Sequence, residues 1–150
     1  MIDQLGPDGS NIFYTPQDRL ISADNSGTHA PVANPGTISG FKFKDLDGDS
    51  VWDANEPGLK DWVIFIDANN DGIRQSTEYA TVTDADGSYK ISNLPAGTHK
   101  VKEVQQAGWT QTLVPAAVTL TAGQNKTGVN FGNKLAASGS VSGYKYNDKN

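Results

Sequence analysis

The fold is decided by the stretch Asp45-Leu46-Asp47-Gly48-Asp49-Ser50-Val51-Trp52-Asp53-Ala54-Asn55-Glu56. Its pattern returns in Asp67-Ala68-Asn69-Asn70-Asp71-Gly72-Ile73-Arg74-Gln75-Ser76-Thr77-Glu78. Both stretches place oxygen-bearing side chains at positions 1, 3, 5, 9 and 12 of a 12-residue loop. This is the spacing with which a loop wraps Ca²⁺, the backbone carbonyl of position 7 completing the ligand set.

The sequence therefore predicts two calcium sites. The expected ligands of the first loop are Asp45, Asp47, Asp49, Val51, Asp53 and Glu56. The expected ligands of the second loop are Asp67, Asn69, Asp71, Ile73, Gln75 and Glu78. Val51 and Ile73 stand at position 7 and would contribute only their backbone carbonyls. The second loop has Gly72 at position 6, where the turn is sharp, whereas the first has Ser50 there and more carboxylates.

Asp84 and Asp86 follow a further predicted strand, directly before Gly87. They either complete a third calcium site or stabilise their own tight turn, which is a common role of Asp side chains. The net charge of −5 supports cation binding in general, because eight of the 17 acidic residues lie inside the two loops. The same charge argues against nucleic acid as a partner, since no basic stripe is present.

The two loops are not helix–loop–helix hands. Pro57-Gly58 follows the first loop at once, and Gly40-Phe41-Lys42-Phe43 before it alternates as a strand does. Short β-type runs separated by turn residues continue along the chain, and no segment has a sustained helical period. The predicted strands are 37–44, 62–66, 79–83, 88–92, 98–105, 109–113, 117–121 and 127–131. This pattern predicts an all-β sandwich in which calcium braces interstrand loops.

Alternation also makes predictions about individual side chains. Phe41 and Phe43 lie on one face of their strand, so Lys42 should point to solvent if the two aromatic rings point to the core. Trp62 lies in the apolar run Trp62-Val63-Ile64-Phe65-Ile66 and is expected in the core. The chain has no cysteine, which excludes disulfides and thiolate metal sites. The chain contains no run of 18 apolar residues, so the sequence predicts no membrane span.

The segment 139–150 repeats the segment 36–47, a constant offset of 103 residues. Gly, Ser, Gly, Lys and Asp are identical between the two, and Phe is replaced by Tyr twice. We therefore expect a piece of a tandem array. The expected organisation is an irregular leader or the tail of a preceding module at 1–35, a calcium-binding sandwich at 36–134, and a linker with the first strand of a following repeat at 135–150.

The order of motifs resembles the B-type repeat of serine–aspartate repeat adhesins, which is related to the collagen-adhesin B-type domain. The resemblance rests on Gly40-Phe41-Lys42-Phe43, Glu56-Pro57-Gly58-Leu59, Thr83-Asp84, Gly87-Ser88-Tyr89, Leu94-Pro95-Ala96-Gly97, Gly108-Trp109-Thr110-Gln111-Thr112 and Asn130-Phe131-Gly132-Asn133. It implies a seven-stranded Greek-key β-sandwich of immunoglobulin-like or prealbumin-like kind. It also implies an extracellular, cell-attached bacterial protein in which this module is a spacer.

Some related B-type domains form an internal amide bond between a Lys on the first strand and an Asn or Asp on the last, assisted by a buried Glu. The matching positions are Lys42, Glu103 and either Asn133 or Asn130. Burial would favour the neutral amine of the lysine, and a protonated Glu would polarise the amide carbonyl. The resemblance thus implies a self-catalysed isopeptide bond, whereas the alternation of the first strand opposes it.

The favoured function is a calcium-rigidified spacer whose partners are neighbouring repeats or subunits. One alternative is an adhesive module that binds a carbohydrate or a protein through Trp52, Trp109 or Tyr79 on exposed loops. Another is a filament subunit joined by strand addition through Ser140 to Asn147 or residues 1–35. Catalysis on an external substrate is not expected, because His29 and His99 stand in unrelated contexts without a nucleophile motif.

Overall fold

The computed structural model describes residues 31–137, 139 and 142–145 of the chain. Within these ranges the chain forms ten short strands and no helix, so none of the described residues lies in a helix that could cross a membrane. The strands are β1 (Gly36–Lys44), β2 (Val63–Ile66), β3 (Ala80–Val82), β4 (Ser88–Leu94), β5 (Gly97–His99), β6 (Val101–Glu103), β7 (Trp109–Leu113), β8 (Val118–Leu120), β9 (Asn125–Lys126) and β10 (Phe131–Leu135). The expected all-β class is confirmed.

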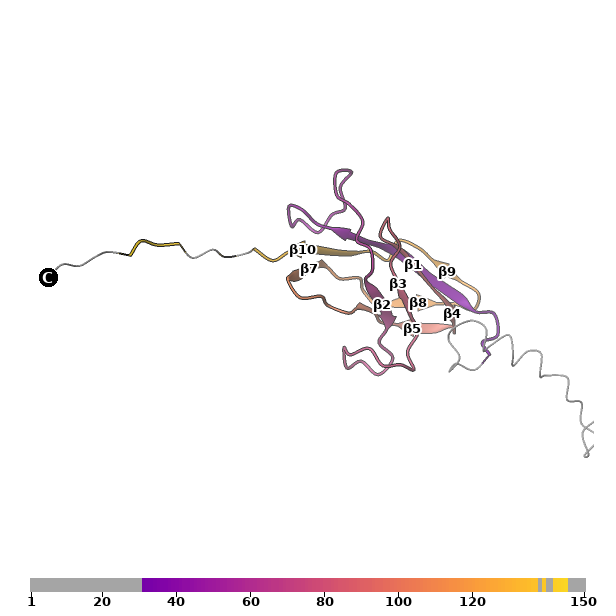
Figure 1. Ribbon diagram of the computed structural model, residues 1–150. Coiled ribbons are helices and arrows are strands. Elements are labelled where there is room, and N and C mark those ends of the chain that lie inside the picture. Colours follow the sequence, from indigo (N-terminus) through magenta and orange to yellow (C-terminus); the bar gives the residue numbers. More distant parts are fainter. Residues whose placement is uncertain (1–30, 138, 140–141, 146–150) are drawn as a thin grey trace, which may run out of the picture.

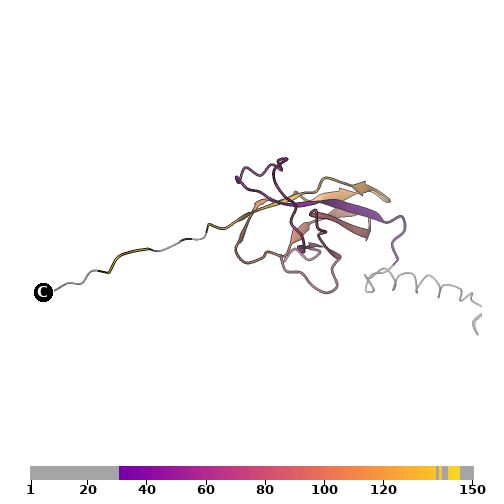
Figure 2. The same cartoon turned by 45° about the horizontal axis from the view of Figure 1, so that its top comes forward.

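The strands form two facing layers (Figures 1 and 2). One layer has the order β4-β1-β10-β7, and β9 also pairs with β1. The other contains β3-β2-β6 together with the pair β5-β8, and only one residue separates β5 from β6. The first and last strands, β1 and β10, are parallel neighbours in the centre of their layer, with Lys42 opposite Phe131 and Lys44 opposite Asn133. The chain therefore begins and ends its sandwich on adjacent strands.

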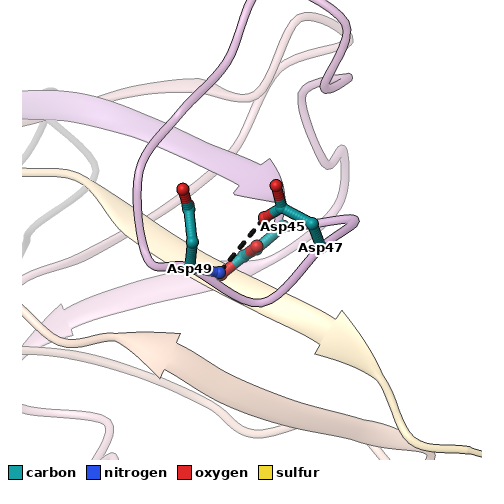
Figure 3. Close-up of side chains that lie close together, drawn as sticks. All are labelled: Asp45, Asp47 and Asp49. Atoms are coloured by element: carbon teal, nitrogen blue, oxygen red, sulfur yellow. Dashed lines mark hydrogen bonds between the residues drawn. The ribbon is translucent and has the colours of Figure 1, made fainter.

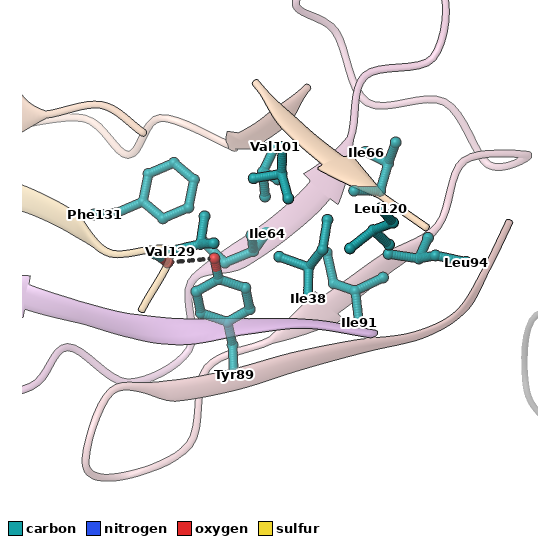
Figure 4. Close-up of a cluster of buried hydrophobic side chains, with 11 residues drawn as sticks. Ile38, Ile64, Ile66, Tyr89, Ile91, Leu94, Val101, Leu120, Val129 and Phe131 are labelled. Carbon is teal, nitrogen blue, oxygen red and sulfur yellow. Dashed lines mark hydrogen bonds between the residues drawn. The ribbon is translucent and has the colours of Figure 1, made fainter. Parts of the chain in front are cut away.

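The core lies between the two layers and is built from branched aliphatic side chains (Figure 4). Ile38 of β1 and Ile91 of β4 meet Ile64 of β2 and Leu120 of β8, all at most 2% exposed. Because these residues come from both sheets, their burial holds the sheets face to face. The hydroxyl of Tyr89, also in this cluster, donates a hydrogen bond to the carbonyl of Val129 at 2.5 Å.

The end of β1 differs from the alternation expected from its sequence. Lys42 and Phe43 are both 0% exposed, so the strand is covered on both faces there. The rings of Phe41 and Phe43 pack against Trp52, with centroid distances of 4.8 and 5.6 Å. Trp52 belongs to the first loop, which folds back over this face. The aromatic face of β1 is thus covered by a loop, and Lys42 takes the face toward the opposite sheet.

The last strand also differs from the prediction of residues 127–131. The structure has a two-residue strand, β9, and then a longer strand, β10, which begins at Phe131. Gly128 between them has φ +75°, which interrupts the extended backbone. The chain stays beside β1 there, since the Val129 N–H donates to the carbonyl of Ser39 at 3.1 Å. The predicted strand 98–105 is in fact two strands, β5 and β6, which pair with β8 and β2 respectively. The remaining predicted strands agree with the observed ones to within a few residues.

The start of β1 and the end of β10 lie at opposite ends of the sandwich (Figure 1). The predicted leader lies outside the described residues as far as residue 30, and part of the predicted following repeat does so too. The domain boundaries therefore remain a prediction.

The close approach of residue 129 to β1 gives a testable prediction at Gly40. A Cβ added there would lie 1.9 Å from the Val129 carbonyl oxygen, so two backbones would have to separate. Gly40→Ala should lower the free energy of unfolding by about 1–3 kcal/mol, the usual cost of overpacking. The exposed Ser92→Ala on β4 is the control and should stay within about 0.5 kcal/mol of the parent. Urea unfolding measures both, and equal stability of the two variants would contradict the packing described.

Candidate functional site

The first loop is organised around Asp45, the buried residue that follows β1. Its two carboxylate oxygens accept hydrogen bonds from the N–H groups of Gly48 at 2.6 Å and Ser50 at 2.9 Å. Ser50 adopts φ +69°, so position 6 takes the left-handed turn even though it is not glycine. Glu56, at position 12, accepts from Leu46 at 2.6 Å and Asp53 at 3.1 Å. Positions 1 and 12 therefore close the loop from both ends.

The second loop has a closely similar hydrogen-bond scheme, in which position 1 accepts from positions 5 and 6 and not from positions 4 and 6. Asp67 accepts from the N–H groups of Asp71 and Gly72, at 3.1 and 2.9 Å. Glu78 accepts from the N–H groups of Ala68 and Gln75, at 2.8 and 2.9 Å, as Glu56 does at the corresponding positions of the first loop. Positions 1 and 12 are buried in both loops. Two stretches with one sequence pattern have thus folded into closely similar local structures.

The loops differ in how their remaining carboxylates are placed. Ligand oxygens of Asp45, Asp47 and Asp49 lie within 4.8 Å of one another, a grouping that could hold a metal ion (Figure 3). In the second loop, one oxygen of Asp71 instead accepts the side-chain amides of Asn69 at 2.8 Å and Gln75 at 2.6 Å. The position 7 side chains, Val51 and Ile73, are exposed in both loops. The first loop is the better prepared of the two for a cation.

Two carboxylates of the first loop have shifted pKa values. Desolvation, followed by the carboxylates of Asp49 and Glu56, raises the pKa of Asp53. For Asp45, burial works against ionisation, but the nearby Thr112 side chain and the hydrogen bonds from the Ser50 and Gly48 N–H groups lower its pKa overall. The donors are all oxygens, which hard cations such as Ca²⁺ prefer. The residues present therefore fit calcium.

Asp86 takes part in its own turn. One of its carboxylate oxygens accepts hydrogen bonds from the Ser88 hydroxyl at 2.6 Å and the Ser88 N–H at 2.9 Å, and these bonds lower its pKa. The Gly87 N–H donates to the carbonyl of Asp84 at 2.9 Å. This geometry favours the tight turn over a third metal site at Asp84 and Asp86.

A second candidate site is buried between the layers. Lys42 of β1 and Asn133 of β10 are 0% exposed, and Glu103 of β6 reaches both from the facing sheet. Lys42 Nζ lies 2.7 Å from Glu103 Oε2, and Asn133 Nδ2 donates to Glu103 Oε1 at 2.7 Å. One carboxylate therefore bridges an amine and a carboxamide on adjacent parallel strands. This brings together three of the four residues proposed for an isopeptide bond.

Asn130, the fourth residue proposed for the isopeptide bond, lies outside this buried group, because its Oδ1 accepts a hydrogen bond from the Phe41 N–H at 3.0 Å.

The surroundings of this group leave its polar atoms incompletely paired. The Lys42 to Glu103 contact is an ion pair without hydrogen-bond geometry, and Asn133 Oδ1 has no hydrogen-bond partner. The ring of Trp62 lies 4.4 Å from Lys42 Nζ, a contact that the sequence did not reveal. Burial lowers the pKa of Lys42 to about 8, although the Glu103 carboxylate opposes the shift. The amine is therefore far more readily neutral than an exposed lysine.

The first loop is attached directly to the strand that carries Asn133. The Asp45 N–H donates to the Asn133 carbonyl at 2.9 Å, and Lys134 Nζ donates to the Asp47 carbonyl at 2.9 Å. The Ser50 hydroxyl reaches the Thr112 carbonyl on β7 at 2.9 Å. Sequence reasoning missed these contacts because they join positions far apart in the chain. The two candidate sites are thus neighbours across β1 and β10.

The aromatic residues proposed for a binding surface pack against the sandwich, although Trp52 also stays 37% exposed. Trp52 covers Phe41 and Phe43, and its indole N–H donates to the Glu56 carbonyl at 3.0 Å. Trp109 meets Trp62 edge to face at 5.7 Å, and Tyr79 packs against the core. This arrangement gives the adhesive alternative no support from these residues.

Known proteins resemble this chain in both sequence and fold. The model of the SdrD B-like domain family matches residues 36–138. Serine-aspartate repeat-containing protein C of Staphylococcus aureus strain MRSA252 is 32% identical over an alignment of 124 positions that covers 76% of this chain and 13% of the relative. The protein of the same name from strain N315 is 31% identical and covered to 12%. The chain thus spans only a small part of these relatives' length.

Two solved structures share the fold at lower identity. GBS52, the minor pilin of Streptococcus agalactiae, has a TM-score of 0.52 at 22% identity, with 75% of this chain and 50% of the pilin covered. The full-length RrgB pilus protein of Streptococcus pneumoniae has a TM-score of 0.51 at 18% identity, covering 72% and 26%.

These findings confirm the β-sandwich and the resemblance described above, and with them the extracellular, cell-surface location. The module is a repeat of a surface protein, and the chain belongs to the SdrD B-like domain family.

Proposed function

We propose that this module is a load-bearing spacer, stiffened by calcium in its two loops and closed by an amide bond between Lys42 and Asn133. The observation that carries the proposal is the buried group in which Glu103 contacts both partners at 2.7 Å. A buried, poorly paired amine beside a carboxamide is costly in a finished structure. Such an arrangement is expected before a reaction that converts the amine and the carboxamide into one amide bond.

The bond formation follows from this geometry. Glu103 takes a proton from Lys42, and the neutral Nζ attacks Cγ of Asn133. The carboxamide then turns so that Oδ1 takes the place of Nδ2 beside Glu103. The protonated Glu103 donates to Oδ1 as negative charge develops there, which lowers the barrier in a site closed to solvent. When the carbon–nitrogen bond to Nδ2 breaks, Nδ2 receives the proton that Glu103 delivered and leaves as ammonia, while Glu103 takes the surplus proton from Nζ and ends protonated. The result is one new amide, and no external reagent is consumed.

The position of the bond explains why it would suit a spacer. Tension on a module in series enters at the start of β1 and leaves at the end of β10. A bond from residue 42 to residue 133 carries that tension directly across two adjacent strands. The residues between them would then bear little load. Hydrogen bonds alone between two parallel strands would have to resist the same force by shear.

Calcium has a separate role in the same function. Each loop closes on itself by hydrogen bonds to positions 1 and 12, and clusters of carboxylates repel one another without a cation. Ca²⁺ would remove this repulsion and hold the loops in one shape. The first loop would act as the stronger brace, because its three grouped carboxylates lie beside β10. The filament alternative by strand addition stays a prediction, since most of its segments lie outside the described residues.

Intact mass spectrometry tests the amide bond. The purified chain should weigh one ammonia less than its sequence, because the reaction releases Nδ2 of Asn133. Lys42→Met and Asn133→Ala should have full sequence mass, and Glu103→Gln should lose ammonia far more slowly. Asn130→Ala is the matched control and should keep the loss, since Asn130 contacts the Phe41 backbone instead. A full sequence mass for the folded parent chain would contradict the bond.

Calorimetric titration tests the metal sites. The parent chain should bind two Ca²⁺ ions, and Glu56→Gln and Glu78→Gln should each remove one, because position 12 supplies the bidentate ligand. Asp86→Asn is the control and should leave two. In the Asn133→Ala background, Ca²⁺ at 100 times its Kd should add about 2.7 kcal/mol of stability per site. Unchanged melting in chelator and in excess calcium would rule out calcium as a brace.

The buried lysine predicts a pH dependence in a chain that cannot cross-link. In Asn133→Ala, Lys42 keeps its lowered pKa of about 8 when folded and returns to its usual 10.5 when unfolded. Between these pH values the unfolded chain binds more protons, so the free energy of unfolding rises with pH. Lys42→Met combined with Asn133→Ala should lack this rise. Urea unfolding at several pH values measures the difference, and parallel curves would show that Lys42 is not desolvated.

A further inference from the structure

The end of the sandwich that carries the first loop holds the departing chain firmly. β10 remains paired with β7 up to Leu135, which lies opposite Trp109. The next residue is also fixed, because the Ala136 N–H donates to the Gly108 carbonyl at 2.8 Å. The chain therefore leaves this module in a defined position and direction.

The opposite end holds the entering chain equally firmly. Gly36, the first residue of β1, is buried and pairs with Leu94 of β4. A Cβ at Gly36 would lie 2.6 Å from the Gln124 carbonyl oxygen, so the turn 121–124 is seated directly on the strand. The Gly123 N–H also donates to the Asn34 carbonyl at 2.7 Å, two residues before β1 begins.

The repeat in the sequence puts these two ends in series. Gly139 corresponds to Gly36, so a following module would begin its first strand there. Only Ala137 and Ser138 stand between Ala136, fixed by one module, and Gly139, fixed by the next. The three peptide units from Ala136 to Gly139 span at most about 11 Å. The end of the following module would therefore lie within about 11 Å of the end of this one.

The two facing surfaces are compatible in chemistry. The exit end presents Leu135, which is 47% exposed, and beside it the first loop, in which Leu46 is 44% exposed. Lys134 joins them, since its amine donates to the carbonyl of Asp47, the neighbour of Leu46. The entry end consists of the turns 95–97 and 121–124, which contain no charged residue. These turns bring no charge of their own to the leucine side chains, and the exposed carboxylates of Asp47 and Asp49 in the same loop would be neutralised by the proposed Ca²⁺.

We propose that the repeat beginning at Gly139 docks end to end on Leu135, Gly108 and the first loop, through its own counterparts of the turns 95–97 and 121–124. The junction is then a stiff contact between modules, and strand exchange is not needed for it. This inference rests on the proposed spacer function and adds the surface by which successive spacers keep one direction. A stalk built in this way would transmit orientation as well as length.

The test uses a two-module chain made of residues 1–138 followed by residues 36–150, which keeps the natural register. The chain has no cysteine, so Ser92→Cys in each module gives two unique spin-label positions on exposed sites of β4. Pulsed electron resonance should give one narrow distance distribution. Inserting Gly-Ser-Gly-Ser between Ala137 and Ser138 should widen it at least about twofold, because a flexible linker separates the ends. A parent distribution as wide as that of the insertion variant would overturn the proposal.

A surface variant tests whether the docking contact, and not only the short linker, keeps the distance distribution narrow. Leu135→Asp in the first module should widen the distribution, whereas Val82→Asp, at a side chain 51% exposed on β3, should not. Equal, narrow distributions for both variants would overturn the docking surface. Calcium stoichiometry and the loss of ammonia are measured on the original chain. The docking proposal can therefore be refuted while the proposed spacer function is supported. The spacer function can likewise be refuted while the docking is supported.

Discussion

The structure depends on a buried charge. Lys42 and Glu103 form an ion pair at 2.7 Å between the two sheets, where neither side chain has more than 2% exposure. Such a pair contributes little net stability, because both groups lose their hydration, but removing one partner alone typically costs about 3–5 kcal/mol. The pair therefore specifies which strands face each other more than it strengthens the fold. With Asn133 bonded to the same carboxylate, it fixes β1, β6 and β10 relative to one another.

The burial of Lys42 depends in turn on the first loop. A strand with lysine between two phenylalanines can bury the lysine only if something else covers the aromatic face. Trp52 does this, stacking on Phe43 with an interplanar angle of 15°. The loop is also joined to the last strand, through the Asp45 N–H and the Asn133 carbonyl. The first loop and the buried group are therefore structurally coupled, and ordering the loop also orders the strands that carry Lys42 and Asn133.

The sequence predicted the β-sandwich, the two loops and their equivalence, because these follow from local spacing of turn residues and carboxylates. It did not predict the orientation of Lys42, since alternation assumes that only one face of a strand is buried. It also left Asn133 and Asn130 as alternatives. Choosing between them requires the end of β9 and the start of β10, which depend on the left-handed Gly128 and on the absence of a side chain at Gly40. The orientation of Lys42 and the choice between Asn133 and Asn130 are both determined by contacts between residues distant in the chain. A local sequence pattern cannot predict such contacts.

The two loops have closely similar hydrogen-bond schemes but are attached to different parts of the sandwich. The first is held by Asn133, Lys134 and Thr112, on the sheet that contains both ends of the module. The second follows β2 and is held by Lys100, whose carbonyl accepts the Asp67 N–H at 2.9 Å and whose amine donates to Asn70 at 2.6 Å. A force transmitted from β1 to β10 would pass through the strands to which the first loop is attached. It would not pass through the strands to which the second loop is attached. In the proposed spacer, two similar loops would therefore have different mechanical roles: the first would stiffen the path of tension, and the second would stabilise the sheet that supplies Glu103.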